Sequence, residues 1–219
     1  MSEPATPDGG QHAIAMDAMY RYQRHIYDLT RKYYLFGRDR MIAGLNPPEG
    51  GSLLEVACGT ARNLKKASAL YPQARLYGFD ISSEMLISAR RTFQHCTARP
   101  MLRTADACTF RPDAFAVDGF DRIMISYAVS MIPEWEKASE NAIKALAPGG
   151  SLHIVDFGQQ EGLPGWFKTG LNQWLAKFHV TPRSDFRQVL EMQAAAAGAR
   201  LTFTSVGRGY ASLAVIERQ

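Results

Sequence analysis

Strand-like and helix-like patterns of apolar residues alternate along residues 53–156. Short runs of Val, Ile, Leu and Phe, typical of strands buried on both faces, are separated by stretches in which apolar residues recur every three or four positions. The pattern predicts helices at 61–70, 83–92 and 134–147, and strands at 53–56, 75–79, 100–104, 121–127 and 151–156. This alternation favours an α/β fold, a parallel sheet with helices on both faces.

The C-terminal part of the chain follows another pattern. Residues 148–150, Pro-Gly-Gly, predict a helix stop and a turn before the strand at 151–156. A helix is expected over 183–197, ending at Gly198. The β-rich runs at 201–206 and 210–216 flank a Gly-Arg-Gly sequence and predict an antiparallel hairpin. The two hairpin strands bring the expected sheet to seven strands.

The first predicted strand leads into a turn that suits a nucleoside. A single glycine, Gly59, lies in this turn between the strand and the next helix, and the second strand ends on the acid Asp80. A glycine turn lets backbone N–H groups approach a ligand, while an acid closing the neighbouring strand accepts hydrogen bonds from ribose hydroxyls.

The glycine pattern narrows the choice of nucleoside. A nicotinamide or flavin dinucleotide site needs G-x-G-x-x-G, and here Ala57 and Thr60 flank Gly59. A phosphate-binding Walker A loop needs Lys-Ser/Thr after its second glycine, and that pair is missing from this turn. S-adenosylmethionine has no phosphate, so one close backbone approach suffices, and an acid such as Glu55 suits its ammonium.

Five motifs in this order resemble those of class I S-adenosylmethionine-dependent methyltransferases. They are residues 55–60, 79–86, 104–107, 121–127 and 145–152, although Ala57 stands where that family usually has glycine. The resemblance implies a Rossmann-like sheet, S-adenosylmethionine as cofactor and S-adenosylhomocysteine (SAH) as product. It also implies a set of cofactor-binding residues, namely Glu55, Ala57, Cys58, Gly59, Thr60, Asp80, Ile81, Met85, Asp106, Ala107, Ser126 and Tyr127.

Composition excludes several other classes of protein. The three cysteines form no C-x-x-C pair, which argues against a disulfide framework and against a metal site. The N-terminus does not resemble a signal peptide and no apolar run is long enough to span a membrane, so we expect a cytoplasmic protein. Residues 60–103 are basic, with eight Lys or Arg and two acids, but surface charge of this density is normal.

A nucleic-acid substrate is not expected. Asn46-Pro47-Pro48 resembles part of the signature of nucleobase-amine methyltransferases, but it precedes the first strand. The position after the fourth strand, where that signature belongs, holds residues 125–128, Ile-Ser-Tyr-Ala.

The segment before the first strand carries two side-chain types at helical spacing. Residues 14–36 lack Pro and Gly, and Tyr20, Arg24, Tyr27, Arg31 and Tyr34 fall near one face of the expected helix. Arginine suits a carboxylate or phosphate, and tyrosine faces suit an ammonium or a sulfonium. The alternative is a helix that docks on the core through its tyrosines, with the arginines solvated or paired with acids.

Residues 25–40 resemble the N-terminal signature of the bacterial betaine-lipid N-methyltransferases, which trimethylate the amine of diacylglyceryl-homoserine. The resemblance implies that Tyr27 closes over the methionine end of the cofactor and that Arg31 or Arg38 binds the homoserine carboxylate. The substrate-binding candidates are Arg24, Arg31, Tyr34 and Arg38. The catalytic residue is left open among Tyr27, His25 and His153, with His179 as a further candidate base.

These interpretations predict how the chain is organised. Residues 1–12 are expected to be disordered, and residues 13–219 to form one methyltransferase domain. That domain divides into a substrate-side helix (13–45), a cofactor-binding core (46–158), an insertion or lid (159–182), and a C-terminal helix and hairpin (183–219).

The acceptor is expected to be a small molecule or a lipid headgroup, with peripheral contact at the inner face of the membrane. The aromatic residues of the insertion suit either a lid against acyl chains or the bilayer, or ordinary core packing; they are Trp166, Phe167, Trp174 and Phe178. The alternatives are a methyltransferase for a quinone precursor or phosphatidylethanolamine, and a cofactor-binding module without catalysis. The sequence leaves open the oligomeric state and the number of methyl transfers.

Overall fold

A computed structural model describes residues 35–178 and 180–219 of the protein. Expectations that concern residues 1–34 or residue 179, including the long N-terminal helix and its Tyr and Arg side chains, lie outside the described residues. Within the described residues, the elements in chain order are α2 (Arg38–Ala43), β1 (Ser52–Val56), α3 (Arg62–Leu70), β2 (Arg75–Asp80), α4 (Ser83–Thr92), β3 (Met101–Thr104), the 3-10 helix η1 (Pro112–Phe115), β4 (Phe120–Ser126), α5 (Trp135–Lys144), β5 (Leu146–Phe157), α6 (Gly165–Ala176), α7 (Phe186–Ala196), β6 (Ala199–Val206) and β7 (Ala211–Arg218).

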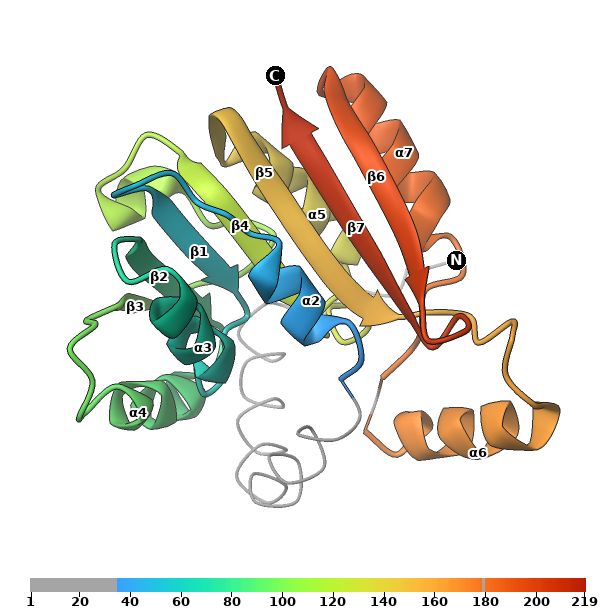
Figure 1. The fold of residues 1–219 in the computed structure, drawn as a ribbon. Coiled ribbons are helices and arrows are strands. Elements are labelled where there is room, and N and C mark those ends of the chain that lie inside the picture. Colours follow the sequence, from blue (N-terminus) through green and yellow to red (C-terminus); the bar gives the residue numbers. More distant parts are fainter. Residues whose placement is uncertain (1–34, 179) are drawn as a thin grey trace, which may run out of the picture.

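The strands form one seven-stranded sheet in the order β3-β2-β1-β4-β5-β7-β6 (Figure 1). The strands β1 to β5 pair in parallel, while β7 runs antiparallel to both β5 and β6. The predicted sheet and its C-terminal hairpin are confirmed. The order reverses between β1 and β4, so the carboxyl ends of these two strands border the crevice in which such sheets bind ligands.

Helices cover both faces of the sheet. On one face α2, α3 and α4 bury Met41, Leu64 and Leu86 against the strands, and on the other α5 and α7 bury Trp135 and Leu190. In Figure 1, α6 lies beyond the carboxyl ends of the parallel strands rather than on either face. The cores on the two faces fix the sheet, and the loops at its carboxyl edge are thereby held in place.

The predicted boundary between the third helix and the fifth strand is wrong. We expected a helix over 134–147 and a turn at 148–150, but α5 ends at Lys144 and β5 already begins at Leu146. Pro148 disfavours a helical conformation at the residue before it. The pairing shifts from Phe120↔Leu146 to Arg122↔Ser151, so residues 147–150 bulge from the ladder, and Gly149 there has φ of +73°.

Other elements agree with the predicted pattern within a few residues. Ser82 caps α4, because its hydroxyl accepts a hydrogen bond from the backbone N–H of Met85 at 3.3 Å. The predicted helix over 183–197 is α7, and Gly198 after it has a positive φ. The 3-10 helix η1 and the 12-residue helix α6 were not predicted. The division of the chain into four functional parts stays a prediction.

Candidate cofactor site

The turn after β1 has a strained, compact backbone. Ala57, Gly59 and Ala61 all have positive φ, at 52°, 54° and 57°. A left-handed conformation costs a residue with a Cβ roughly 1–2 kcal/mol. Ala57 is therefore strained at the position where the methyltransferase pattern has glycine, and the departure noted in the sequence has a conformational cost as well as a steric one.

Asp80 ties this turn to the next one. Its carboxylate accepts hydrogen bonds from the backbone N–H of Gly59 at 2.8 Å and from that of Ser82 at 2.9 Å. The side chain is 6% exposed. Thr92, at the end of α4, adds a third tie, because its hydroxyl donates to the Thr60 carbonyl at 2.8 Å. The glycine turn and the end of β2 thus form one rigid unit.

Glu55 is buried beneath the same turn and caps α3. One carboxylate oxygen accepts from the Asn63 amide at 2.7 Å and the other from the Leu64 backbone N–H at 3.3 Å. Ala61, the residue before α3, has no side chain that could cap the helix. A carboxylate at a helix N-terminus also interacts favourably with the helix dipole. Contact of Glu55 with the cofactor ammonium stays a prediction.

Cys58 packs inside the turn as an apolar filler. It is 5% exposed, and its backbone N–H donates to the Phe79 carbonyl at 2.8 Å. Burial, and then the neighbouring Glu55 and Asp80 carboxylates, raise the pKa of the thiol well above its ordinary value. The thiol is therefore protonated at neutral pH and is no nucleophile.

Asp106 shapes a third turn at the same edge. Its carboxylate accepts from the Cys108 backbone N–H at 2.7 Å, and Ala107 beside it is buried. Asn141 on α5 holds this turn from behind, since its amide donates to the carbonyls of Ala107 and Phe110 at 3.1 and 3.0 Å. Three turns, after β1, β2 and β3, thus meet at the carboxyl edge of the sheet.

The end of β4 completes the edge with Ser126 and Tyr127. Ser126 is 5% exposed, and its hydroxyl oxygen is buried with no hydrogen-bond partner among the described residues. Tyr127 has a φ of 53° and donates from its hydroxyl to the Phe36 carbonyl at 2.6 Å. A buried hydroxyl that lacks a partner fits a bound polar ligand. Tyr127 instead fastens the chain just before α2.

Of the remaining sequence candidates, Met85 and Ile81 belong to this edge and Arg38 lies close to it. Met85 is buried at the first turn of α4, and Ile81 follows Asp80. Arg38 begins α2, and its guanidinium lies close enough to Tyr127 to act on the pKa of that phenol, although burial dominates and raises it. Its Nε donates to Asp39 at 3.2 Å.

His153, a candidate base in the sequence, lies inside the sheet. It is in the middle of β5, in register with Met124 of β4, which pairs in turn with Glu55 of β1. The ring is 5% exposed, and its Nε2 lies 2.9 Å from the Ser151 hydroxyl. His153 is thus packed as a core residue, and its role as a base stays a prediction. The other candidates, His25, Tyr27 and His179, lie outside the described residues, as do Arg24, Arg31 and Tyr34.

The buried imidazole predicts a pH effect on stability. Burial, and then the Arg122 charge, lower the pKa of His153 from its ordinary 6.5 to about 4. The unfolded chain takes up this proton at a higher pH than the folded chain does, so stability should fall as the pH drops from 6.5 towards 4. The loss from this group should approach about 3 kcal/mol. Thermal unfolding of the wild type and of His153→Gln between pH 7 and pH 4 measures it, and equal pH dependence in both proteins would contradict the assignment.

Sequence reasoning missed one acid that stabilises the edge. Asp156, near the end of β5, is buried and accepts from the backbone N–H of Ser130 at 3.0 Å and of Phe157 at 2.7 Å. Burial raises the pKa of its carboxyl. Asp156 thereby joins the loop after β4 to the end of β5. The signal was available, because an acid at the end of a buried strand is the same feature that identified Asp80.

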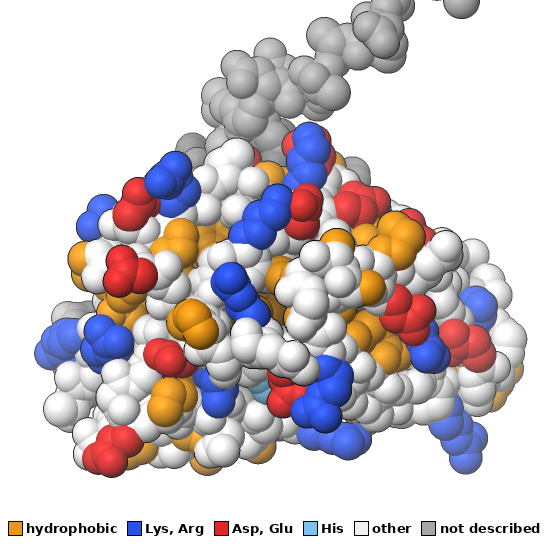
Figure 2. All heavy atoms as spheres, turned by 90° about the horizontal axis from the view of Figure 1, so that it is seen from above, with side chains coloured by type: hydrophobic (Ala, Val, Ile, Leu, Met, Phe, Trp, Pro, Cys, Tyr) orange, Lys and Arg blue, Asp and Glu red, His pale blue; other side chains and the backbone are white. Residues whose placement is uncertain are grey.

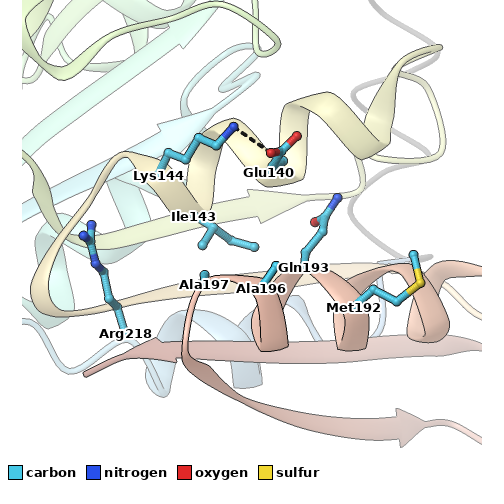
Figure 3. A pocket seen from close by; sticks show the side chains of 8 residues that line it. All are labelled: Glu140, Ile143, Lys144, Met192, Gln193, Ala196, Ala197 and Arg218. Atoms are coloured by element: carbon cyan, nitrogen blue, oxygen red, sulfur yellow. Dashed lines mark ion pairs between the residues drawn. The ribbon is translucent and has the colours of Figure 1, made fainter.

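Another cavity lies away from this edge. It has a volume of about 530 Å³ and is lined by α5, α7 and the end of β7 (Figure 3). Lys144 and Glu140 pair there at 2.6 Å, and Arg218 donates to the Leu146 carbonyl at 2.7 Å. Arg218 ends the antiparallel strand β7, so this cavity belongs to the opposite edge of the sheet. Figure 2 views that edge, where positive and negative side chains are interspersed as on an ordinary solvated surface.

Comparison with known proteins supports the resemblance to methyltransferases. Residues 53–150 match the family described as methyltransferase domain. The demethylmenaquinone methyltransferase of Desulfitobacterium hafniense is 27% identical over 157 residues, which cover 68% of this chain and 59% of that protein. The chain thus matches less than two thirds of the length of this relative.

Two solved structures share the fold. A methyltransferase of Aquifex aeolicus that depends on S-adenosylmethionine superposes with a TM-score of 0.62 at 17% identity, over 98% of this chain and all of that one. The plantazolicin methyltransferase BpumL, solved with SAH and a triazolic desmethyl analogue of plantazolicin, superposes with a TM-score of 0.68 at 14% identity, over 96% and 98% of the two chains. At these identities the likeness concerns the fold.

Proposed function

We propose that this chain, whose residues 53–150 match a methyltransferase domain, transfers methyl groups from S-adenosylmethionine to the amine of diacylglyceryl-homoserine. The product is the trimethylated betaine lipid. The proposal that the protein binds this cofactor rests on the carboxyl edge of the sheet. There Asp80 fixes the glycine turn, and the buried Ser126 hydroxyl has no partner among the described residues.

The residues at this edge fit the parts of S-adenosylmethionine. The turn at 57–61 brings backbone close to the ligand, the acid at the end of β2 suits the ribose, and Asp106 suits the adenine amine. S-adenosylmethionine supplies an electrophilic methyl carbon. The protein would act mainly by orienting the neutral amine in line with it and by excluding water.

The proposed identity of the methyl acceptor rests on residues 25–40, whose sequence resembles the N-terminal signature of the betaine-lipid N-methyltransferases. The described end of that segment supports the proposal, because Tyr127 at the end of β4 holds the Phe36 carbonyl, two residues before Arg38. The segment therefore arrives at the carboxyl edge of the sheet, next to the proposed methyl donor. In this proposal Tyr27 covers the cofactor, and Arg31 or Arg38 binds the carboxylate.

A quinone precursor is the second candidate acceptor. The relative from Desulfitobacterium hafniense is a demethylmenaquinone methyltransferase, and the similarity favours a quinone acceptor. The two candidates differ in charge. A homoserine headgroup needs cationic partners, whereas a quinone ring needs an apolar slot.

Methyl transfer to defined acceptors tests the proposal. The full chain is incubated with methyl-labelled S-adenosylmethionine and vesicles that contain diacylglyceryl-homoserine, phosphatidylethanolamine or a demethylated quinone. We expect label in the homoserine lipid, and chromatography against the mono-, di- and trimethylated standards gives the number of transfers. Label in the quinone alone would establish the second candidate, and label in protein or RNA but not in lipid would contradict both.

A further inference from the structure

A second cavity lies beside α6, and we call it the α6 cavity. Its volume is about 460 Å³, within the usual range of small-molecule sites. The lining comes from three segments, the loop after β5, one side of α6, and the stretch after α6. The residues are Gln159, Gln160, Lys168, Asn172, Ala176, Val180, Thr181 and Pro182.

The α6 cavity borders the loop that follows the cofactor edge of β4. The Thr181 backbone N–H donates to the Ser130 carbonyl at 3.0 Å, and the Ser130 backbone N–H donates to Asp156 at 3.0 Å. Ser130 stands four residues after Ser126, which ends β4 at the proposed cofactor edge. A ligand in the α6 cavity would therefore lie near the loop that follows β4, next to the proposed site of the methyl donor.

The α6 cavity is positively charged. Lys168 is the charged residue of its lining, it is exposed, and it forms no ion pair with any residue of 35–178 or 180–219. The sequence contains no Asp or Glu between Glu161 and Asp185. Arg38, by contrast, shares the carboxylate of Asp39 with Lys66. A cation without an ion-pair partner among the described residues suits an anionic ligand.

Gln160, which also lines the α6 cavity, has a buried hydrogen-bond acceptor. The side chain is 2% exposed, and its amide nitrogen donates to the Gly158 carbonyl at 2.9 Å. The amide oxygen Oε1 is buried without a partner among the described residues. Leaving a buried polar atom unpaired costs about 1–3 kcal/mol. A ligand N–H or O–H would remove that cost.

We propose that the α6 cavity binds the polar headgroup of the acceptor. Lys168 binds its carboxylate or phosphate, and Gln160 Oε1 accepts a hydrogen bond from an amine or hydroxyl next to that anion. The assignment of the ligand as the acceptor rests on the proposed function, whereas binding of such a group can be measured without methyl transfer. Carboxylate and phosphate headgroups share the chemistry that Lys168 recognises.

Binding of two soluble probes to the full chain tests the inference. L-homoserine carries an amine and a carboxylate, O-phosphoethanolamine carries an amine and a phosphate, and ethanolamine lacks the anion. Dissociation constants come from amide NMR titrations of the wild type, Lys168→Ala, Lys168→Arg and Gln160→Leu. Lys177→Ala is the matched control, because this exposed lysine directly follows α6 and does not line the cavity.

We expect one of the two anionic probes to bind and ethanolamine not to bind. Lys168→Ala should weaken binding about tenfold or more, Lys168→Arg should keep it within about threefold, and Gln160→Leu should weaken it severalfold. Lys177→Ala should match the wild type. Absence of binding by both probes, or the same affinity in Lys168→Ala, would overturn the inference.

Turnover separates this inference from the proposed function. If a probe binds through Lys168 but neither lipid is methylated, the α6 cavity remains an anion site and the proposed function fails. If the homoserine lipid is methylated with the same KM in Lys168→Ala and in the wild type, the function stands and the α6 cavity is not its headgroup site.

Discussion

Replacing Asp80 with alanine is expected to lower the affinity for S-adenosylmethionine about 100-fold or more. The carboxylate holds the N–H groups of Gly59 and Ser82, and both groups become unpaired when it is removed. Each unpaired buried group costs about 1–3 kcal/mol, and the turn that should receive the nucleoside loses its fixed shape. Loss of the acid that should face the ribose adds to the effect.

The control for Asp80 lies at the other edge of the sheet. Asp121 also accepts two hydrogen bonds, from the backbone N–H and the hydroxyl of Ser52 at 2.7 and 2.8 Å, but at the start of β4. Asp121→Ala should lower the thermal stability and leave the cofactor affinity unchanged. Calorimetric titration with SAH well below both unfolding temperatures compares the two variants, and equal affinities would remove Asp80 from the site.

Replacing Gly158 with alanine is expected to destabilise the protein by about 3 kcal/mol, which is roughly 6–12 °C in unfolding temperature. A Cβ at this position would lie 2.3 Å from the Gly209 carbonyl oxygen, an atom of the hairpin backbone that cannot move aside freely. The Gly158 N–H donates to the Tyr210 carbonyl at 2.9 Å, and the Gln160 N–H to the Gly209 carbonyl at 2.8 Å. The clash therefore separates the loop after β5 from the hairpin.

Gly170→Ala is the matched substitution. A Cβ at Gly170, in the interior of α6, would have open space within 4 Å, and alanine is the better helix former. That variant should keep or slightly raise the unfolding temperature. If differential scanning calorimetry gave Gly158→Ala the stability of the wild type, the close packing of the hairpin against this loop would be wrong.

The sequence predicted the fold and the cofactor edge because both follow from local patterns. Buried strands, a single-glycine turn, and an acid at the end of β2 lie within a few residues of one another, and their spacing fixes what meets at the carboxyl edge. The bulge at 147–150 was not predicted. A Pro-Gly-Gly sequence is typical both of a turn that precedes a strand and of a bulge within a strand, and the sequence alone does not distinguish the two.

Contacts between distant residues could not be predicted from such patterns. Glu55 is predicted to contact the cofactor ammonium, and only the packed structure shows that its carboxylate caps α3. His153 has the right side chain for a base, but its position within β5 depends on the strand boundaries. The α6 cavity combines three segments, of which α6 itself was not predicted, so Lys168 and Gln160 had no visible connection in the sequence.

No helix among residues 35–178 and 180–219 is both long and apolar enough to cross a membrane. Trp166, at the start of α6, is 78% exposed to solvent.

Calorimetric titration of the full chain with SAH tests the central claim most directly. The account predicts one saturable site per chain, formed by the turns after β1, β2 and β3, with binding strongly weakened in Asp80→Ala and retained in Asp121→Ala. Absence of SAH binding to the folded wild-type protein would contradict the assignment of this edge as the cofactor site, and with it every proposal about the acceptor.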